Sequence, residues 1–155
     1  MHDTISGNGN ILANVVNYGG AFSPGFSPGE INIDGALTMY DGIMNFEIGG
    51  TSSGLFDVLN VSGPVNIFGG DIVSSFIDGF IPELGDSFEF LISPEIFIDP
   101  LVEFTFFGLP DYYGFDYSSS GMLMTVDVES VPEPKVVYLL IVGLIYIWCF
   151  LDENH

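Results

Sequence analysis

Short runs of alternating apolar and polar residues fill the chain up to about residue 130. Met44, Phe46 and Ile48 alternate with Ile43, Asn45 and Glu47, and this run ends at Gly49-Gly50. Successive side chains of a β-strand point to opposite faces of its sheet, so a period of two predicts strands buried on one face. No stretch before Val136 has a helical period, and the body is therefore predicted to be all-β. The same alternation recurs at 87–92, 101–106 and 122–128.

Proline and glycine corners favour a solenoid over a sandwich. Ser23-Pro24-Gly25 and Ser27-Pro28-Gly29 lie between two predicted strands, Ile11–Val16 and Ile31–Leu37. Proline fixes φ at one turn position and glycine supplies the positive φ that follows, so each triplet predicts a tight corner. Short strands joined by such corners are typical of a short parallel β-helix. Three glycine pairs are expected to mark strand ends: Gly19-Gly20, Gly49-Gly50 and Gly69-Gly70.

The C-terminal stretch 131–155, VPEPKVVYLLIVGLIYIWCFLDENH, has a different pattern. Pro132 and Pro134 are incompatible with a helix interior or a central strand, so the β body is predicted to end there. Val136–Leu151 is uncharged and apolar on every side, as in a lipid-exposed helix. It would extend roughly 24 Å, against about 30 Å of hydrocarbon core, and Tyr146 and Trp148 would suit the interface.

These features predict a passenger domain over residues 1–130 and a tail over 131–155, with Ser130–Pro134 as the linker. The tail is predicted to hold one transmembrane helix, residues 136–151. A buried C-terminal core helix is the alternative. The single cysteine, Cys149, lies inside the apolar tail, so the chain has no disulfide framework.

The tail resembles the PEP-CTERM sorting signal of Gram-negative bacteria. The matching residues are the motif Val131, Pro132, Glu133 and Pro134, followed by the apolar stretch Leu139–Leu144. The resemblance implies a tail held in the inner membrane and processed by an exosortase, a membrane transpeptidase that releases the passenger to the surface or matrix. The family pattern closes with basic residues, whereas this chain closes with Asp152, Glu153, Asn154 and His155.

The body resembles the repeat-rich passengers of autotransporters and of many PEP-CTERM proteins. The paired SPG triplets precede GEINIDGALTM, and a G-x-x-F-D-x-L-x-V-x-G segment follows. This resemblance implies a right-handed parallel β-helix in an exported structural passenger, without particular catalytic chemistry. The residues of the second motif are Gly54, Phe56, Asp57, Leu59, Val61 and Gly63.

The charge balance excludes several classes of partner. The chain has 21 acidic residues and one basic residue, Lys135, for a net charge of −20. Nothing in it neutralises phosphates, so nucleic-acid binding is excluded, and attraction to anionic lipid surfaces is disfavoured. Ample apolar and aromatic material separates the chain from disordered acidic segments.

Catalytic and metal chemistry are not expected. His2 and His155 lie at opposite ends of the chain, so neither a nucleophile–histidine dyad nor a histidine-rich metal site is predicted. A carboxylate pair such as Asp57 and Asp71 is the only catalytic device to consider. The Asp-Gly turns at Asp34, Asp41 and Asp78 are interpreted as turns rather than calcium loops, and no cofactor is predicted.

Aromatic residues gather irregularly in 94–121. We interpret this stretch as a pair of strands that caps the open end of the solenoid. The functional alternative is a sugar-stacking platform formed by Tyr112, Tyr113 and Tyr117, with exopolysaccharide as its ligand.

The sequence thus predicts a non-enzymatic, exported surface or extracellular-matrix protein, membrane-held through its tail until processed. MHDTISGNGN has neither a basic nor an apolar segment, so no signal peptide is visible. Lys135, on the N-terminal flank of the tail helix, supports a rival hypothesis, a cytoplasm-facing tail-anchored β-domain. A carbohydrate-binding module is the third hypothesis.

Overall fold

The computed structural model describes residues 4–25, 28–108, 113–118 and 122–128, the last two ranges as backbone. Every regular element in these ranges is a β-strand, which confirms the all-β prediction. Within the described ranges no helix has the length and apolar character needed to cross a membrane. The predicted linker and the predicted helix at 136–151 lie outside the described residues.

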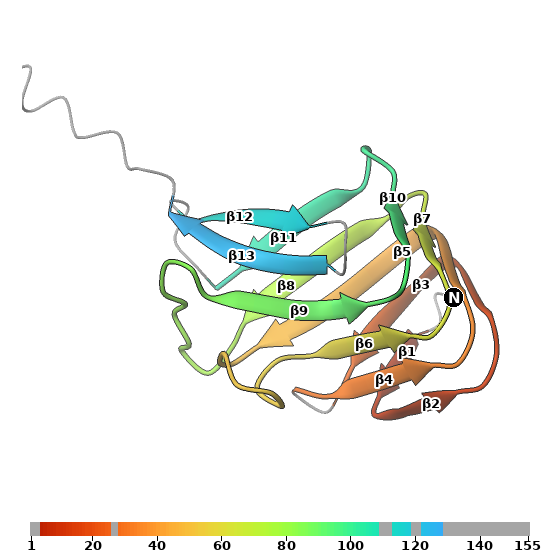
Figure 1. Ribbon diagram of the computed structural model, residues 1–155, viewed down its shortest axis with the longest axis horizontal. Helices are drawn as coiled ribbons and strands as arrows, with labels where there is room; N and C mark the ends of the chain where they lie inside the picture. Colours follow the sequence, from red (N-terminus) through yellow and green to blue (C-terminus); the bar gives the residue numbers. More distant parts are fainter. Residues whose placement is uncertain (1–3, 26–27, 109–112, 119–121, 129–155) are drawn as a thin grey trace, which may run out of the picture.

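The chain passes back and forth between two sheets (Figure 1). In Figure 1, β9, β6, β4 and β2 lie side by side in front, with β8, β5 and β3 behind them. The first sheet contains β1 (Thr4–Gly7), β3 (Val15–Pro24), β5 (Leu37–Ile48), β7 (Val65–Ile67), β8 (Asp71–Phe76), β10 (Ile96–Ile98) and β11 (Glu103–Phe107). The second sheet contains β2 (Gly9–Ile11), β4 (Glu30–Ile33), β6 (Val58–Val61), β9 (Ser87–Ile92), β12 (Tyr113–Ser118) and β13 (Met122–Val128).

Parallel pairing joins strands that are one circuit of chain apart. In the first sheet Val15 pairs with Leu37 and Leu37 with Val65, so the second of these circuits is longer than the first. The second sheet has the same two intervals, because Ile11 pairs with Ile33 and Ile33 with Val61. Equivalent positions of consecutive circuits therefore lie one above another.

This register explains the core. The inward residues of β5 and β7 (Leu37, Met39, Val65 and Ile67) are completely buried. Phe46 of β5 meets Phe90 of β9 across the interior, with ring centroids 4.6 Å apart. Burying apolar side chains of this size stabilises the fold by about 1.5–3 kcal/mol each. The predicted alternation of Met44, Phe46 and Ile48 is confirmed, since all three are buried.

The end of the body departs from the predicted cap. Residues 96–107 continue the parallel sheet: β10 pairs with β7, and β11 with β8. The antiparallel pair comes later, with β13 against β9 and β12 against β13. The alternating run at 101–106 therefore adds one more parallel layer before the chain reverses direction.

Three local predictions were wrong. Gly19-Gly20 lie inside β3, at a place where the register with β5 shifts twice, whereas Gly49-Gly50 follow β5 and Gly69-Gly70 separate β7 from β8. Neither predicted strand beside the triplets is a single strand, because 11–16 spans the end of β2 and the start of β3, and 31–37 spans β4 and the start of β5. Ser23 and Pro24 belong to β3, so Gly25, with φ of 92°, is the corner residue.

A fourth correction concerns β9. The alternation predicts Phe88, Phe90 and Ile92 on one face, but Leu91 is buried and Ile92 is exposed. Leu91 pairs with the buried Leu59, and the register of β13 against β9 shifts at this point. The irregularity turns Leu91 inward in place of Ile92.

Candidate functional site

Most of the predicted site residues lie outside the described residues. These are the sorting motif Val131, Pro132, Glu133 and Pro134, and Tyr112 of the aromatic platform. The backbone places Tyr113 and Tyr117 in β12, the edge strand of the second sheet. The sugar platform therefore stays a prediction.

Asp57 is the buried carboxylate of the described chain, with 1% of its surface exposed. The Gly29 N–H donates to its Oδ1 at 2.6 Å, and the Glu47 N–H donates to its Oδ2 at 2.8 Å. Its own N–H donates to the Glu47 carbonyl at 2.9 Å. One side chain thus fastens the start of β4 to the end of β5, and we call this group the aspartate corner.

Burial raises the pKa of Asp57 to about 6, because desolvation penalises the charged carboxylate. The two backbone donors oppose this shift, and the nearby Glu47 carboxylate adds to it. Both carboxylate oxygens accept backbone hydrogen bonds and the side chain is closed to solvent. The Asp57–Asp71 pair is thus no open catalytic pair: Asp57 is a structural fastener, and Asp71 begins β8.

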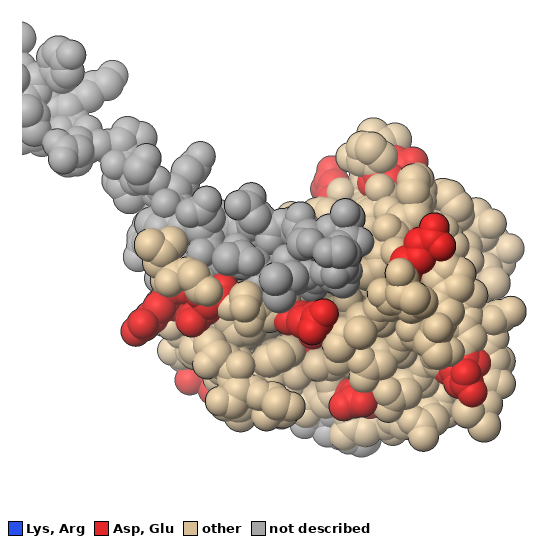
Figure 2. All heavy atoms as spheres, in the orientation of Figure 1, with Lys and Arg blue, Asp and Glu red and all other residues tan. Residues whose placement is uncertain are grey.

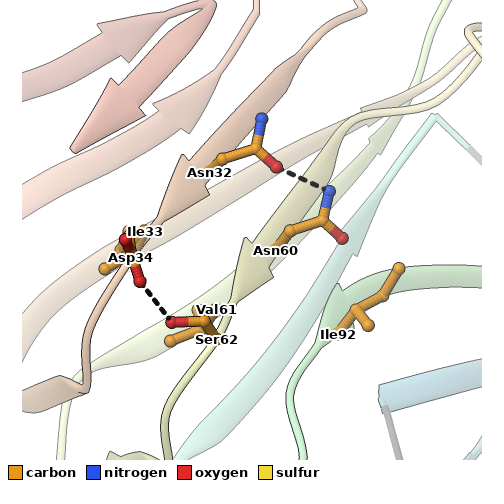
Figure 3. A pocket seen from close by; sticks show the side chains of 7 residues that line it. All are labelled: Asn32, Ile33, Asp34, Asn60, Val61, Ser62 and Ile92. Atoms are coloured by element: carbon orange, nitrogen blue, oxygen red, sulfur yellow. Dashed lines mark hydrogen bonds between the residues drawn. The ribbon is translucent and has the colours of Figure 1, made fainter. Parts of the chain in front are cut away.

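A shallow hollow of about 250 Å³ lies on the outer face of the second sheet (Figure 3). The Asn60 Nδ2 donates to Asn32 Oδ1 at 3.0 Å and to Glu30 Oε1 at 2.9 Å. The Ser62 hydroxyl donates to Asp34 Oδ1 at 3.0 Å and accepts from the Gly35 N–H. The lining residues of the hollow are Asn32, Ile33, Asp34, Asn60, Val61, Ser62 and Ile92.

The hollow follows from the register. Asn10, Asn32 and Asn60 occupy equivalent positions of three consecutive circuits, with Ile92 on the fourth. Asn60 bonds to Asn32 and to Glu30 along the sheet, which uses part of the hydrogen-bonding capacity of these side chains. Nowhere in the described ranges do three His, Cys, Asp or Glu side chains gather as metal ligands would. The hollow is therefore mainly a self-bonded polar ladder.

A row of exposed aromatic rings, which we call the aromatic ladder, follows the first sheet from circuit to circuit. Tyr18 and Tyr40 stack with centroids 5.2 Å apart and planes 9° apart, and Tyr40 and Phe68 with centroids 5.4 Å apart. Phe97 continues the row at 5.6 Å from Phe68. The exposed fractions are 76% for Tyr18, 49% for Tyr40, 44% for Phe68 and 46% for Phe97.

A column of glycines bends the first sheet beside this ladder. A Cβ on Gly42 would overlap the Gly20 carbonyl oxygen, and one on Gly70 would overlap that of Gly42. The Asn17 amide closes the first bend, because its Oδ1 accepts from the Gly20 N–H at 2.7 Å and its Nδ2 donates to the Gly20 carbonyl. We call Gly20, Gly42 and Gly70 the glycine bend.

The ladder has a sequence signal that the strand analysis missed. An aromatic residue precedes each bend glycine by two positions, and the triplets recur at the same intervals as the circuits. Reading the glycine pairs only as strand ends hid this repeat. The triplets are Tyr18-Gly19-Gly20, Tyr40-Asp41-Gly42 and Phe68-Gly69-Gly70.

The surface charge has one sign over the described part of the chain. Acidic side chains are spread over the face in Figure 2, and no basic side chain is drawn there. Lys135, the single basic residue, lies outside the described ranges. Comparison with protein-family models, curated proteins and solved structures gave no match to this chain.

Proposed function

We propose that this chain is a non-enzymatic, exported structural passenger, built as a short parallel β-solenoid and held in a membrane by its C-terminal tail. An exosortase-like enzyme would process the tail near Val131–Pro134 and release the body to the cell surface or matrix. The observation that carries the proposal is the parallel register between consecutive circuits, which is the architecture of a solenoid passenger.

Three rows of equivalent residues support the solenoid: the buried pair Leu37 and Val65, the exposed-face pair Asn32 and Asn60, and the bend residues Gly42 and Gly70. Each row has the same chemical character on successive circuits. A chain of stacked circuits buries one continuous core and presents long, regular faces. Such faces suit a structural or adhesive role.

The geometry of the polar groups favours a structural role over catalysis. Both carboxylate oxygens of Asp57 accept hydrogen bonds from backbone N–H groups. The amides and acids of the hollow bond mainly to one another. A general acid or base needs a free proton site within reach of a substrate. The acidic surface instead keeps an apolar β protein soluble and discourages association through its strand edges.

The test is the fate of the tail in a Gram-negative host that carries an exosortase. One epitope is inserted between Ser118 and Gly121 and a second after His155, behind a standard export signal. Exosortase-dependent loss of only the C-terminal epitope, with release of the body, is the expected result. The control replaces Pro132, Glu133 and Pro134 with alanine, which should leave the chain intact and membrane-bound.

Retention of both epitopes on the wild-type chain, whether or not exosortase is present, would overturn the processing step. Lys135 on the flank of the tail supports the rival topology, in which the body faces the cytoplasm. Protease added to intact spheroplasts of cells expressing the chain without the fused signal separates the two topologies. Digestion of the inner epitope supports export, and its protection supports a cytoplasmic body.

A further inference from the structure

The aromatic ladder is an exposed apolar strip that lies outside the buried core. Its four rings are each exposed by 44% or more, while core residues on the same strands, such as Met39 and Ile67, are fully buried. Large rings are poorly solvated by water, and contiguous exposed apolar patches usually mark interaction sites. The ladder is therefore a candidate binding surface.

The rings are slipped against one another, which leaves part of each face uncovered. Carbon atoms in contact lie about 3.5–4.0 Å apart, so near-parallel rings with centroids 5.2 and 5.4 Å apart must be offset. The exposed fractions agree with this geometry. Tyr18, Tyr40 and Phe68 therefore present a staircase of ring faces at a nearly constant spacing set by the parallel strands, and the Phe97 ring ends the row at a tilt of 48° to Phe68.

Polar groups that can hydrogen-bond to hydroxyls flank the staircase. Thr38 and Asn66 pair in register and lie two residues before Tyr40 and Phe68, so the alternation of each strand places them on the same outer face. Asp41, beside Tyr40, is exposed. An apolar row edged by hydroxyl, amide and carboxylate groups matches a ligand with apolar C–H faces and polar edges.

We propose that the aromatic ladder binds a linear, uncharged polysaccharide along its length. A pyranose ring has a C–H face that packs on aromatic rings and equatorial hydroxyls that reach flanking polar groups. The inference rests on the proposed function, because it names the partner of an exported passenger. It places that partner on the first sheet rather than at Tyr112, Tyr113 and Tyr117.

The net charge of the chain favours a neutral polysaccharide over anionic polymers, anionic lipid and a second copy of the chain as the ligand of the ladder. With 21 acids and one basic residue, the chain repels anionic polymers, anionic lipid and a second copy of itself. A neutral glycan meets no such repulsion. The regular, linear row of rings also suits a linear repeating ligand better than a single small molecule.

The test is retention of the purified full-length chain, kept in mild detergent, on insoluble neutral polysaccharides (cellulose, curdlan and xylan). Soluble alginate serves as the anionic comparison in affinity electrophoresis. Because this assay is done in vitro, its failure is separate from failure of export or tail processing. We expect retention on at least one neutral polymer and no retardation by alginate.

The decisive variant is Tyr18→Ala/Tyr40→Ala/Phe68→Ala, which we expect to bind at least tenfold more weakly. Tyr40→Phe, which keeps the ring, should stay within threefold of the wild type. The matched control Ile81→Ala/Leu84→Ala removes two exposed apolar side chains of the connection between β8 and β9, which contains no ladder residue, and should not change retention. Circular dichroism confirms that each variant remains folded, and single Tyr40→Ala replaces the triple variant if that one unfolds.

Three outcomes would overturn the proposal. The first is no retention of the wild type on any neutral polymer. The second is equal retention of the wild type and the ladder variants. The third is concentration-dependent dimerisation of the wild type that the triple variant abolishes, since this would assign the ladder to contact between copies.

Discussion

The aspartate corner and the glycine bend solve the same problem, turning the chain along its circuit, in opposite ways. The glycine bend recurs on successive circuits and depends on the absence of side chains, because Gly20, Gly42 and Gly70 approach one another closely. The aspartate corner occurs once among the described circuits and depends on one side chain that bonds Gly29 and Glu47. The outer surface beside the bend carries the exposed aromatic ladder, whereas the side chain of Asp57 at the corner is closed to solvent.

The comparison shows that the glycine bend, which depends on close backbone contacts, and the aspartate corner, which depends on a buried carboxylate, are disrupted by different changes. A bend made of backbone contacts is insensitive to pH but does not tolerate any added atom. A corner made by a buried carboxylate tolerates small changes of shape but responds to pH and to loss of an acceptor. The four predictions below test this difference, from the largest expected effect to the smallest.

Gly42→Ala should have the largest effect. Its φ is 112°, and a Cβ there would overlap the Gly20 carbonyl and lie 2.8 Å from Asn17 Nδ2. Strain and overpacking together should lower the free energy of unfolding by about 3 kcal/mol or more. Urea denaturation followed by far-UV circular dichroism measures this loss.

Gly54→Ala is the matched control for Gly42→Ala. Gly54 also has a positive φ, 85°, but a Cβ there meets nothing within 4 Å. Its cost should be about 1 kcal/mol, from backbone strain alone. Equal losses for the two variants would show that crowding at the bend is not what limits the fold.

Asp57→Asn should come second, at about 2 kcal/mol of lost stability at pH 7. The amide keeps one acceptor oxygen and turns an NH₂ group toward the other backbone N–H, which leaves that donor without an acceptor. Asp41→Asn is the control, because Asp41 is exposed and an amide oxygen can still accept from the Gly42 N–H. Equal urea midpoints for Asp57→Asn and the wild type would contradict the fastener role.

The pH dependence of the aspartate corner comes from the same carboxylate, and a shift of its pKa by roughly two units corresponds to at most about 3 kcal/mol of stability. The pKa of Asp57 is about 6 in the folded protein and about 3.9 in the unfolded chain, so the folded state binds more protons between these values. Its stabilising contribution is complete below about pH 4 and is lost as the pH rises to about 6.

Repulsion among the other acids also weakens the fold as the pH rises, so the useful quantity is a difference. Unfolding free energies of the wild type and Asp57→Asn are measured from pH 4 to 7. The difference between them should narrow as the pH rises through this window, down to the value of about 2 kcal/mol expected at pH 7. Parallel curves would mean that Asp57 titrates alike in the folded and unfolded states.

Loss of one ring from the ladder should have the smallest effect on stability. Phe68→Ala removes contacts with Tyr40 and Phe97, each worth about 0.5–1.5 kcal/mol at most, and the exposed site refills with water. A double-mutant cycle of Tyr40→Ala and Phe68→Ala should give a coupling below about 1 kcal/mol. Coupling above about 2 kcal/mol would make the ladder part of the core.

The sequence sufficed for the strands whose one face is buried, as at Met44, Phe46 and Ile48, because alternation records burial directly. It was also enough for the corners at Gly49-Gly50 and Gly69-Gly70. It failed at Gly19-Gly20, since a glycine that permits a bend inside a strand looks the same as one that ends it.

The candidate surfaces were harder to predict than the strands. Successive circuits differ in length, so no strict repeat aligns Tyr18, Tyr40 and Phe68 until the pairing register is known. Asp57 belongs to a recognisable motif, but a sequence pattern does not reveal which backbone N–H groups donate to a carboxylate. Those donors, Gly29 and Glu47, come from two different strand ends that only the fold brings together.

The central claim is that the aspartate corner contributes to stability without taking part in recognition, whereas the aromatic ladder serves recognition and contributes little to stability. The direct test measures the urea midpoint and retention on a neutral polysaccharide for Asp57→Asn and for Tyr18→Ala/Tyr40→Ala/Phe68→Ala. We predict that Asp57→Asn loses stability but, while folded, is retained like the wild type, and that the ladder variant keeps most of its stability and loses retention. Parallel loss of both properties in both variants would contradict the account.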